Sequence, residues 1–263
     1  PWNPTIEIEL EDGLAPDTVV DPPPPVDSTR FHAAVLRLPH MANFTDFDAL
    51  ARHGVTLHYV HRPRDLSAYD AVFIPGTKNT RGDLDWMREL GWEERIKAFD
   101  GSIVGLCGGY QMLGRSIDDP HGMEGEPGVT LGLDLLPIET VMAPQKVTRP
   151  RRGRMGDVAV EGYEIHVGQT TVTGEPLLQL FDDAGERPEG ARQGRVMGTY
   201  LHGVFDSPGV VEAMLGSIRP DIVWPKLDAH AAWRDRQMDA LAEHMRRSLD
   251  LEFLSELVGY DVS

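Results

Sequence analysis

The stretch from Gly101 to Gly114 constrains the fold of this chain more than any other. It begins with a short apolar run, continues through the only cysteine, Cys107, and ends in residues with helical spacing. A strand, a glycine-flanked nucleophile and a helix in this order predict a nucleophile elbow, which exposes the side chain at the carboxyl end of the strand. Gly105, Gly108 and Gly109 surround the cysteine because a Cβ would clash in so tight a turn.

The predicted elbow also indicates that Cys107 is reactive. The helix that follows directs free N–H groups and a positive dipole end at the sulfur, which favours the thiolate. A lone cysteine is more often a buried, inert side chain. The glycine setting favours the reactive alternative, so Cys107 is the candidate nucleophile.

The segments around the elbow predict an α/β fold. Apolar strands are expected at residues 32–38, 55–60, 69–74 and 194–201, and helices at 43–52, 83–90 and 92–99. Strands that alternate with helices predict a mostly parallel sheet with right-handed crossovers. Residues 158–167 and 169–172 are predicted to be antiparallel strands, and 181–193 a polar loop.

The two ends of the chain differ from this central part. Residues 1–30 are acidic and rich in proline, so they are predicted to be a linker that follows another domain. Residues 6–10 within them alternate like a strand. Residues 31–263 form the main domain, and their last 35 or so residues are predicted to be a helical tail. The apolar stripe of that tail is expected to pack on the core, and it consists of Met238, Leu241, Met245, Leu249 and residues 251–254.

Composition excludes several partners and sites. A formal net charge of -17, from 25 basic and 42 acidic residues, makes binding to nucleic acid unfavourable. No apolar run is long enough to cross a bilayer, so no membrane partner is expected. The ten histidines lack metal-ligand spacing, so no metal site is expected. A single cysteine excludes an internal disulfide and favours the cytoplasm.

Two other segments end strands and therefore belong beside Cys107. Sites in open α/β sheets form at the carboxyl ends of strands. His202 ends an apolar strand and is suited to act as general base and acid for the thiol, although it is equally typical of a core or turn histidine. The turn that contains Gly76 and Thr77 directs backbone N–H groups into the cleft. With the N–H of Gly108 these groups are candidates for an oxyanion hole, unless the turn is an ordinary strand-to-helix connection.

Five segments carry a resemblance to a known family. Residues 105–114 resemble the nucleophile motif of triad-type (class I) glutamine amidotransferases. Residues 37–48, 75–80, 162–166 and 198–206 are similar to the cobyric acid synthase branch of that family. The resemblance implies a flavodoxin-like three-layer domain with a nucleophile elbow and a C-terminal helical extension.

The resemblance also implies an activity. In this family Cys107 would attack the side-chain amide of glutamine, and His202 would protonate the leaving ammonia. Water would then cleave the thioester. Gln111 would help to hold the substrate, and Gly76, Thr77 and Gly108 would stabilise the tetrahedral intermediate.

The resemblance further implies a partner. In this branch, ammonia passes to an ATP-dependent synthetase domain, which amidates adenosylcobyrinic acid a,c-diamide in cobalamin biosynthesis. Residues 9–17 resemble the end of that domain, which would precede this part in the same chain. ATP and Mg²⁺ are expected only there, because this chain has no glycine-rich Walker sequence. No cofactor is therefore expected in this chain.

The third member of the catalytic group is open at this stage. Ordinary class I members have Glu two residues after the histidine, where this chain has Val204. Glu164 or Asp206 is a candidate to orient His202, or the site is a Cys–His dyad. The dyad with Glu164 as a supporting group is the favoured hypothesis. Glu164 is equally typical of a solvated strand face, because its neighbours alternate.

Three alternative functions fit part of the pattern. The chain is similar to glutaminase subunits that serve a ligase for cell-wall lipid precursors. A non-catalytic docking module would keep the fold but not need both Cys107 and His202. A hydrolase of the thiol-peptidase type would not need Gln111. The residues that precede Pro1 in the gene product would separate the first alternative from the favoured one.

Overall fold

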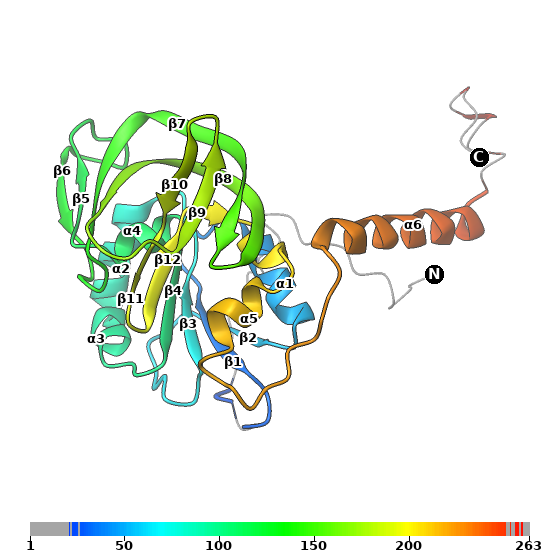
Figure 1. Cartoon of the computed structure of the whole chain (residues 1–263), viewed down its shortest axis with the longest axis horizontal. Coiled ribbons are helices and arrows are strands. Elements are labelled where there is room, and N and C mark those ends of the chain that lie inside the picture. Colours follow the sequence, from blue (N-terminus) through cyan, green and yellow to red (C-terminus); the bar gives the residue numbers. More distant parts are fainter. Residues whose placement is uncertain are drawn as a thin grey trace.

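The computed structural model describes residues 21, 23–25, 27–250, 253, 256–257 and 259. The strand expected at residues 6–10, the similarity at 9–17 and most of the predicted linker lie outside this range. The described residues form a layered α/β body, and one long helix extends from it (Figure 1).

The central sheet has six strands, in the order β11-β12-β4-β3-β1-β2. Their bounds are β1 His32–Leu36, β2 Thr56–Val60, β3 Ala71–Ile74, β4 Ser102–Leu106, β11 Ala191–Gln193 and β12 Val196–Thr199. All neighbours are parallel except the β11–β12 pair at one edge. The order β2-β1-β3-β4-β12 is the flavodoxin-like, doubly wound arrangement, which confirms the predicted fold class.

Helices cover both faces of the central sheet. On one side lie α2 (Thr80–Leu90), α3 (Trp92–Lys97) and α4 (Gly108–Met112), and on the other α1 (Asp48–Arg52) and α5 (Val210–Leu215), as Figure 1 shows. Two short 3₁₀ helices, η1 (Phe44–Phe47) and η2 (Val204–Asp206), complete the helical elements before the tail. Strands covered on both faces need continuous apolar runs. Accordingly, every residue of β1, β3, β4 and β12 is buried.

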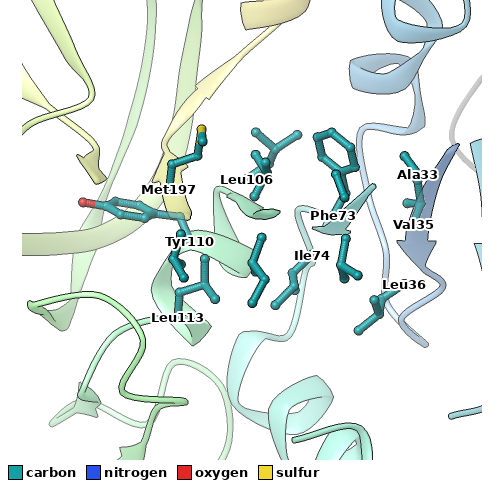
Figure 2. Close-up of a cluster of buried hydrophobic side chains, with 14 of the residues drawn as sticks. Ala33, Val35, Leu36, Phe73, Ile74, Leu106, Tyr110, Leu113 and Met197 are labelled. Carbon is teal, nitrogen blue, oxygen red and sulfur yellow. The ribbon is translucent and has the colours of Figure 1, made fainter. Parts of the chain in front are cut away.

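The core lies between these layers. Phe73 and Ile74 of β3 pack close to Leu106 of β4, and Tyr110 of α4 fills the space next to β12 (Figure 2). Burial of such side chains supplies most of the favourable free energy of folding. The core therefore fixes the carboxyl ends of β3, β4 and β12, where the predicted site residues lie.

A second, largely antiparallel sheet packs above the first. It contains β5 (Ser116–Asp119), β6 (Gly128–Leu131), β7 (Ile138–Met155), β8 (Val158–Val172), β9 (Leu178–Asp182), β10 (Gly185–Glu189) and β13 (Leu201–His202). The antiparallel strands predicted at 158–172 are confirmed as β8. The polar loop expected at 181–193 is wrong, because these residues contribute to β9, β10 and β11. Their polarity reflects largely solvent-facing edge strands rather than a loop.

The C-terminal helix α6 (His230–Ser248) stands away from the body (Figure 1). Its first turn is anchored, because His230 is buried and the Arg52 guanidinium lies 4.4 Å from the centre of the Trp233 ring. Further along, Met238 and Met245 are 54% and 47% exposed. The helical tail is confirmed over this range, but the expectation that its apolar stripe packs on the core is wrong. In the described part of the chain, no helix has the length and apolarity to span a membrane.

Candidate active site

Cys107 occupies a sharp turn between β4 and α4. Its backbone has φ 51° and ψ −107°, a region that costs about 1–3 kcal/mol for a residue with a side chain. A Cβ on Gly109 would lie 2.0 Å from the carbonyl oxygen of Ile74, and one on Gly105 would lie 2.7 Å from the carbonyl oxygen of Gly109. The predicted elbow and the steric reason for its glycines are therefore confirmed.

His202 reaches Cys107 through the neighbouring strand. β12 runs parallel to β4, and its end is held by a hydrogen bond from the Cys107 N–H to the carbonyl oxygen of Thr199, 2.9 Å long. The chain then enters β13, which ends at the buried His202. A Cβ on Gly76 would lie 3.3 Å from Cε1 of His202 and 3.6 Å from Cβ of Cys107. The two side chains thus converge on Gly76.

A buried carboxylate that the sequence did not indicate orients the imidazole. Asp46 in η1 accepts a hydrogen bond at Oδ2 from Nδ1 of His202, 2.7 Å away. Its other oxygen accepts the N–H of Gly203 at 2.9 Å. The side-chain nitrogen of Asn43 lies 3.2 Å from each ring nitrogen of His202. His202 and Asp46 are therefore arranged like the base and the carboxylate of a catalytic triad, next to Cys107.

Glu164 does not orient His202, contrary to the hypothesis above. Tyr163 is the residue of β8 that pairs with His202, and its ring stacks on the imidazole at 5.2 Å between centroids. Glu164 is the next residue of the strand, so it points to the opposite face. There it is buried and accepts hydrogen bonds from Arg151 and Arg187. The alternative of a solvated strand face is also wrong.

Asp206 and a Cys–His dyad are the other two hypotheses for the group that orients His202. Asp206 lies near a different histidine, with Oδ1 3.6 Å from Nδ1 of His230. The dyad hypothesis named Glu164 as the supporting carboxylate, and Asp46 occupies that place instead. Asp46 precedes His202 by 156 residues, and only the tertiary structure brings them together. Asp46 does lie within the segment 37–48 that carries the resemblance, but nothing in that segment singled it out as a partner of His202.

The surroundings of His202 favour its protonated form. Burial by itself lowers the pKa of this imidazole, but hydrogen bonds to Asp46 and Cys107 and the negative charges of both outweigh burial and raise the pKa to about 10. An imidazolium next to Cys107 can donate a proton to a group that leaves during a reaction at the sulfur. The pair is therefore poised for nucleophilic attack followed by proton donation.

Two backbone N–H groups lie beside the thiol. The nitrogen of Thr77 lies 3.2 Å from where a Cβ on Gly108 would stand, so the two residues are in contact. Among the residues that the structure describes, neither the Thr77 N–H nor the Gly108 N–H donates a hydrogen bond. The Thr77 hydroxyl donates to the buried Asp83, which also accepts from Nδ1 of His40 at 2.7 Å. This network holds the turn in place, so both N–H groups are available to an anion.

A cavity of about 380 Å³ opens in front of Cys107. Its lining consists of Ala42, Asn43, Thr77, Lys78, Thr80, Cys107, Gly108, Gln111, Glu124, Met142, Lys146, Ile165, His166 and Val167. This volume is within the usual range for sites of small molecules. The predicted residues Thr77, Cys107, Gly108 and Gln111 all line it, and Gly76 and His202 flank the cysteine.

Gln111 is held rigidly at the cavity wall. Its side-chain nitrogen donates to the hydroxyl of Tyr200 at 2.8 Å, and its oxygen accepts from the hydroxyl of Thr80 at 3.2 Å. Tyr200 in turn stacks on His166 at 3.8 Å between centroids.

Within the described residues, no group of three or more His, Cys, Asp and Glu side chains is arranged to hold a metal ion.

The chain is similar in sequence to known glutamine amidotransferase domains. The sequence model of the CobB/CobQ-like glutamine amidotransferase domain matches residues 32–210. A cobyric acid synthase of Chlorobium phaeobacteroides is 42% identical over 97% of this chain, and one of Chlorobaculum tepidum is 41% identical over the same share. The chain spans 53% of the length of each of these relatives.

Solved structures give the same result for the fold. A glutamine amidotransferase crystal structure superimposes with a TM-score of 0.54 at 19% identity, and covers 71% of this chain and 97% of its own. The structure of PurLQS from Thermotoga maritima gives 0.53 at 15% identity, over 72% of this chain and all of the other. These likenesses support the shared fold. The match over residues 32–210, together with the elbow at Cys107, shows that the chain belongs to the CobB/CobQ-like glutamine amidotransferase domain family.

Proposed function

We propose that the chain hydrolyses the side-chain amide of glutamine and supplies the ammonia to a synthetase domain of a cobyric acid synthase. The observation that carries the proposal is that Cys107, which lines the cavity, lies next to the His202–Asp46 pair in a domain of the amidotransferase family. Hydrolysis of an amide needs a nucleophile, a proton donor for the nitrogen and a stabiliser for the oxyanion. Each of the three has a candidate here.

The reaction begins with attack on the amide. The Cys107 thiolate adds to the amide carbon, and the oxyanion that forms accepts hydrogen bonds from the N–H groups of Thr77 and Gly108. His202 then donates the proton on Nε2 to the departing nitrogen, so that ammonia leaves and a γ-glutamyl thioester remains. Neutral His202 next takes a proton from water, which attacks the thioester. Glutamate leaves, and the thiolate–imidazolium pair is restored.

The acceptor of the ammonia follows from the relatives. Cobyric acid synthases of two Chlorobium species match over nearly the whole chain, and this chain spans about half their length. The remaining half would contain the ATP- and Mg²⁺-dependent activity that amidates adenosylcobyrinic acid a,c-diamide. The names of the relatives favour this role over a cell-wall ligase subunit, and the assembled triad argues against a docking module. A cytoplasmic location fits a chain with a single, catalytic cysteine.

Ammonia release from glutamine tests the proposal. Cys107→Ala should lower the rate by far more than about tenfold, because loss of a nucleophile in a triad removes nearly all catalysis. Labelling with 6-diazo-5-oxo-L-norleucine adds a measurement that does not depend on turnover, since the reagent should form one adduct, on Cys107. Absence of both ammonia and adduct would reject the glutaminase assignment. Amidation of the cobyrinic acid substrate by the full-length gene product tests the acceptor separately.

A further inference from the structure

Three charged side chains that the reaction scheme does not use line the cavity at Cys107. They are Lys78, Glu124 and Lys146. When the amide of glutamine reacts at Cys107, its α-ammonium and α-carboxylate groups lie a short way along the same side chain. A cavity that carries one carboxylate and two ammonium groups is complementary to such a zwitterion.

Glu124 is held in position before any ligand arrives. Its Oε2 accepts the N–H of Arg81 at 2.9 Å, and its own N–H donates to Oδ2 of Asp119 at 2.8 Å. The Arg81 guanidinium binds Asp119 at 3.1 Å and the carbonyl oxygen of Glu126 at 2.7 Å. The loop that carries Glu124 is thus fixed to the start of α2, next to Thr80 and its partner Gln111. Such preorganisation reduces the entropic cost of binding.

One oxygen of the Glu124 carboxylate can accept a further hydrogen bond. Among the described residues, nothing donates a hydrogen bond to its Oε1, and the residue is only partly buried. Lys146 lies on β7, a different wall of the cavity, and forms no ion pair with the described residues. A charge-assisted hydrogen bond is about twice as strong as one between neutral groups.

We propose that Glu124 binds the α-ammonium group of the substrate glutamine and that Lys146 binds its α-carboxylate. The inference rests on the proposed glutaminase function, and it specifies which amides the site accepts. The site would select a free amino acid over simple amides. It would also reject glutamine residues inside peptides, because these have neither free group.

Substrate analogues test this assignment directly. Glutaramic acid lacks the α-amino group, and 4-aminobutanamide lacks the α-carboxylate. Glu124→Gln should lower kcat/KM for glutamine by about tenfold or more, but for glutaramic acid by less than about threefold. Lys146→Met should show the same contrast between glutamine and 4-aminobutanamide. Glu126→Gln is the matched control, because it alters a carboxylate of the same loop that does not line the cavity.

A second readout does not depend on turnover. Glutamine should protect Cys107 from alkylation by iodoacetamide, and Glu124→Gln should raise the concentration needed for half protection by about tenfold. Equal losses for glutamine and glutaramic acid would mean that Glu124 only supports the loop, and would overturn the inference. The inference would also be overturned if Glu124→Gln left the preference for glutamine over glutaramic acid unchanged. If the wild type neither hydrolyses glutamine nor reacts with the diazoketone, the glutaminase assignment itself fails.

Discussion

At the scale of single residues, reactivity depends on how Asp46 and Cys107 act on His202. Asp46 accepts from Nδ1, which leaves Nε2 as the ring nitrogen that can exchange a proton with other groups. A histidine held in this way takes and returns a proton without reorienting. Asp46 is therefore a positioning residue, since it acts on the substrate only through the imidazole.

Asp46→Asn should lower kcat for glutamine hydrolysis by about 100-fold or more, because an amide at this position favours the wrong tautomer. Glu164→Gln is the matched control, since it makes the same change in a buried carboxylate that contacts Arg151 and Arg187 instead. It should change kcat of the folded protein by less than about threefold. A larger effect at Glu164 than at Asp46 would contradict the assignment.

The raised pKa of His202 predicts a pH-dependent stability. Because the folded-state pKa of about 10 exceeds the ordinary value, the protonated imidazole contributes stability that is complete below about pH 6.5 and is lost as the pH rises towards 10. The difference in unfolding free energy between wild type and Asp46→Asn should therefore shrink over this range. Urea denaturation at several pH values measures it. A difference that stays constant would show that Asp46 does not raise this pKa.

At the scale of elements, the elbow is a steric device that needs its glycines. β3, β4 and α4 approach so closely that Gly109 lies against the carbonyl group of Ile74. The close approach places the first N–H groups of α4 at the thiol and joins the Thr77 turn to Gly108. Packing of the two strands against the helix thus creates the reactive geometry.

Gly109→Ala should lower the free energy of unfolding by about 1–3 kcal/mol, the usual cost of overpacking, and reduce glutamine hydrolysis in the protein that still folds. The control is Gly194→Asn, where an added Cβ meets open space and the residue type tolerates the positive φ of 58°. Chemical denaturation compares the two variants. Equal decreases in the unfolding free energy of the two variants would mean that the turn adapts to the added methyl group.

At the scale of the whole molecule, the body and the tail helix are largely separate. The second sheet closes over the carboxyl ends of the central strands, and Ile165 and His166 of β8 line the cavity. The tail helix α6 contacts the body through His230 and Trp233 at its first turn. The site therefore depends on both sheets but not on most of α6.

A chain that ends at Arg236 should keep its glutaminase activity, and its Tm should shift by less than about 2 °C. The reason is that the truncation preserves the contacts of His230 and Trp233 with Arg52, and that most of the described residues it removes are exposed. Differential scanning calorimetry checks the shift. A much larger decrease in Tm would show that the remainder of α6 packs on this domain or on a second copy.

The sequence by itself determined the α/β class and the elbow at Cys107, while the role of His202 beside that cysteine came from the resemblance to a known family. The class and the elbow follow from local constraints, because a buried parallel strand needs an apolar run and a tight turn needs glycine. Only the tertiary structure decided that Asp46, and not Glu164, orients the imidazole. A carboxylate has the same appearance in a sequence whether it is solvated, paired with two arginines or bound to a histidine 156 residues away. Which of these holds depends on the strand crossovers and on the face of β8 from which each side chain projects.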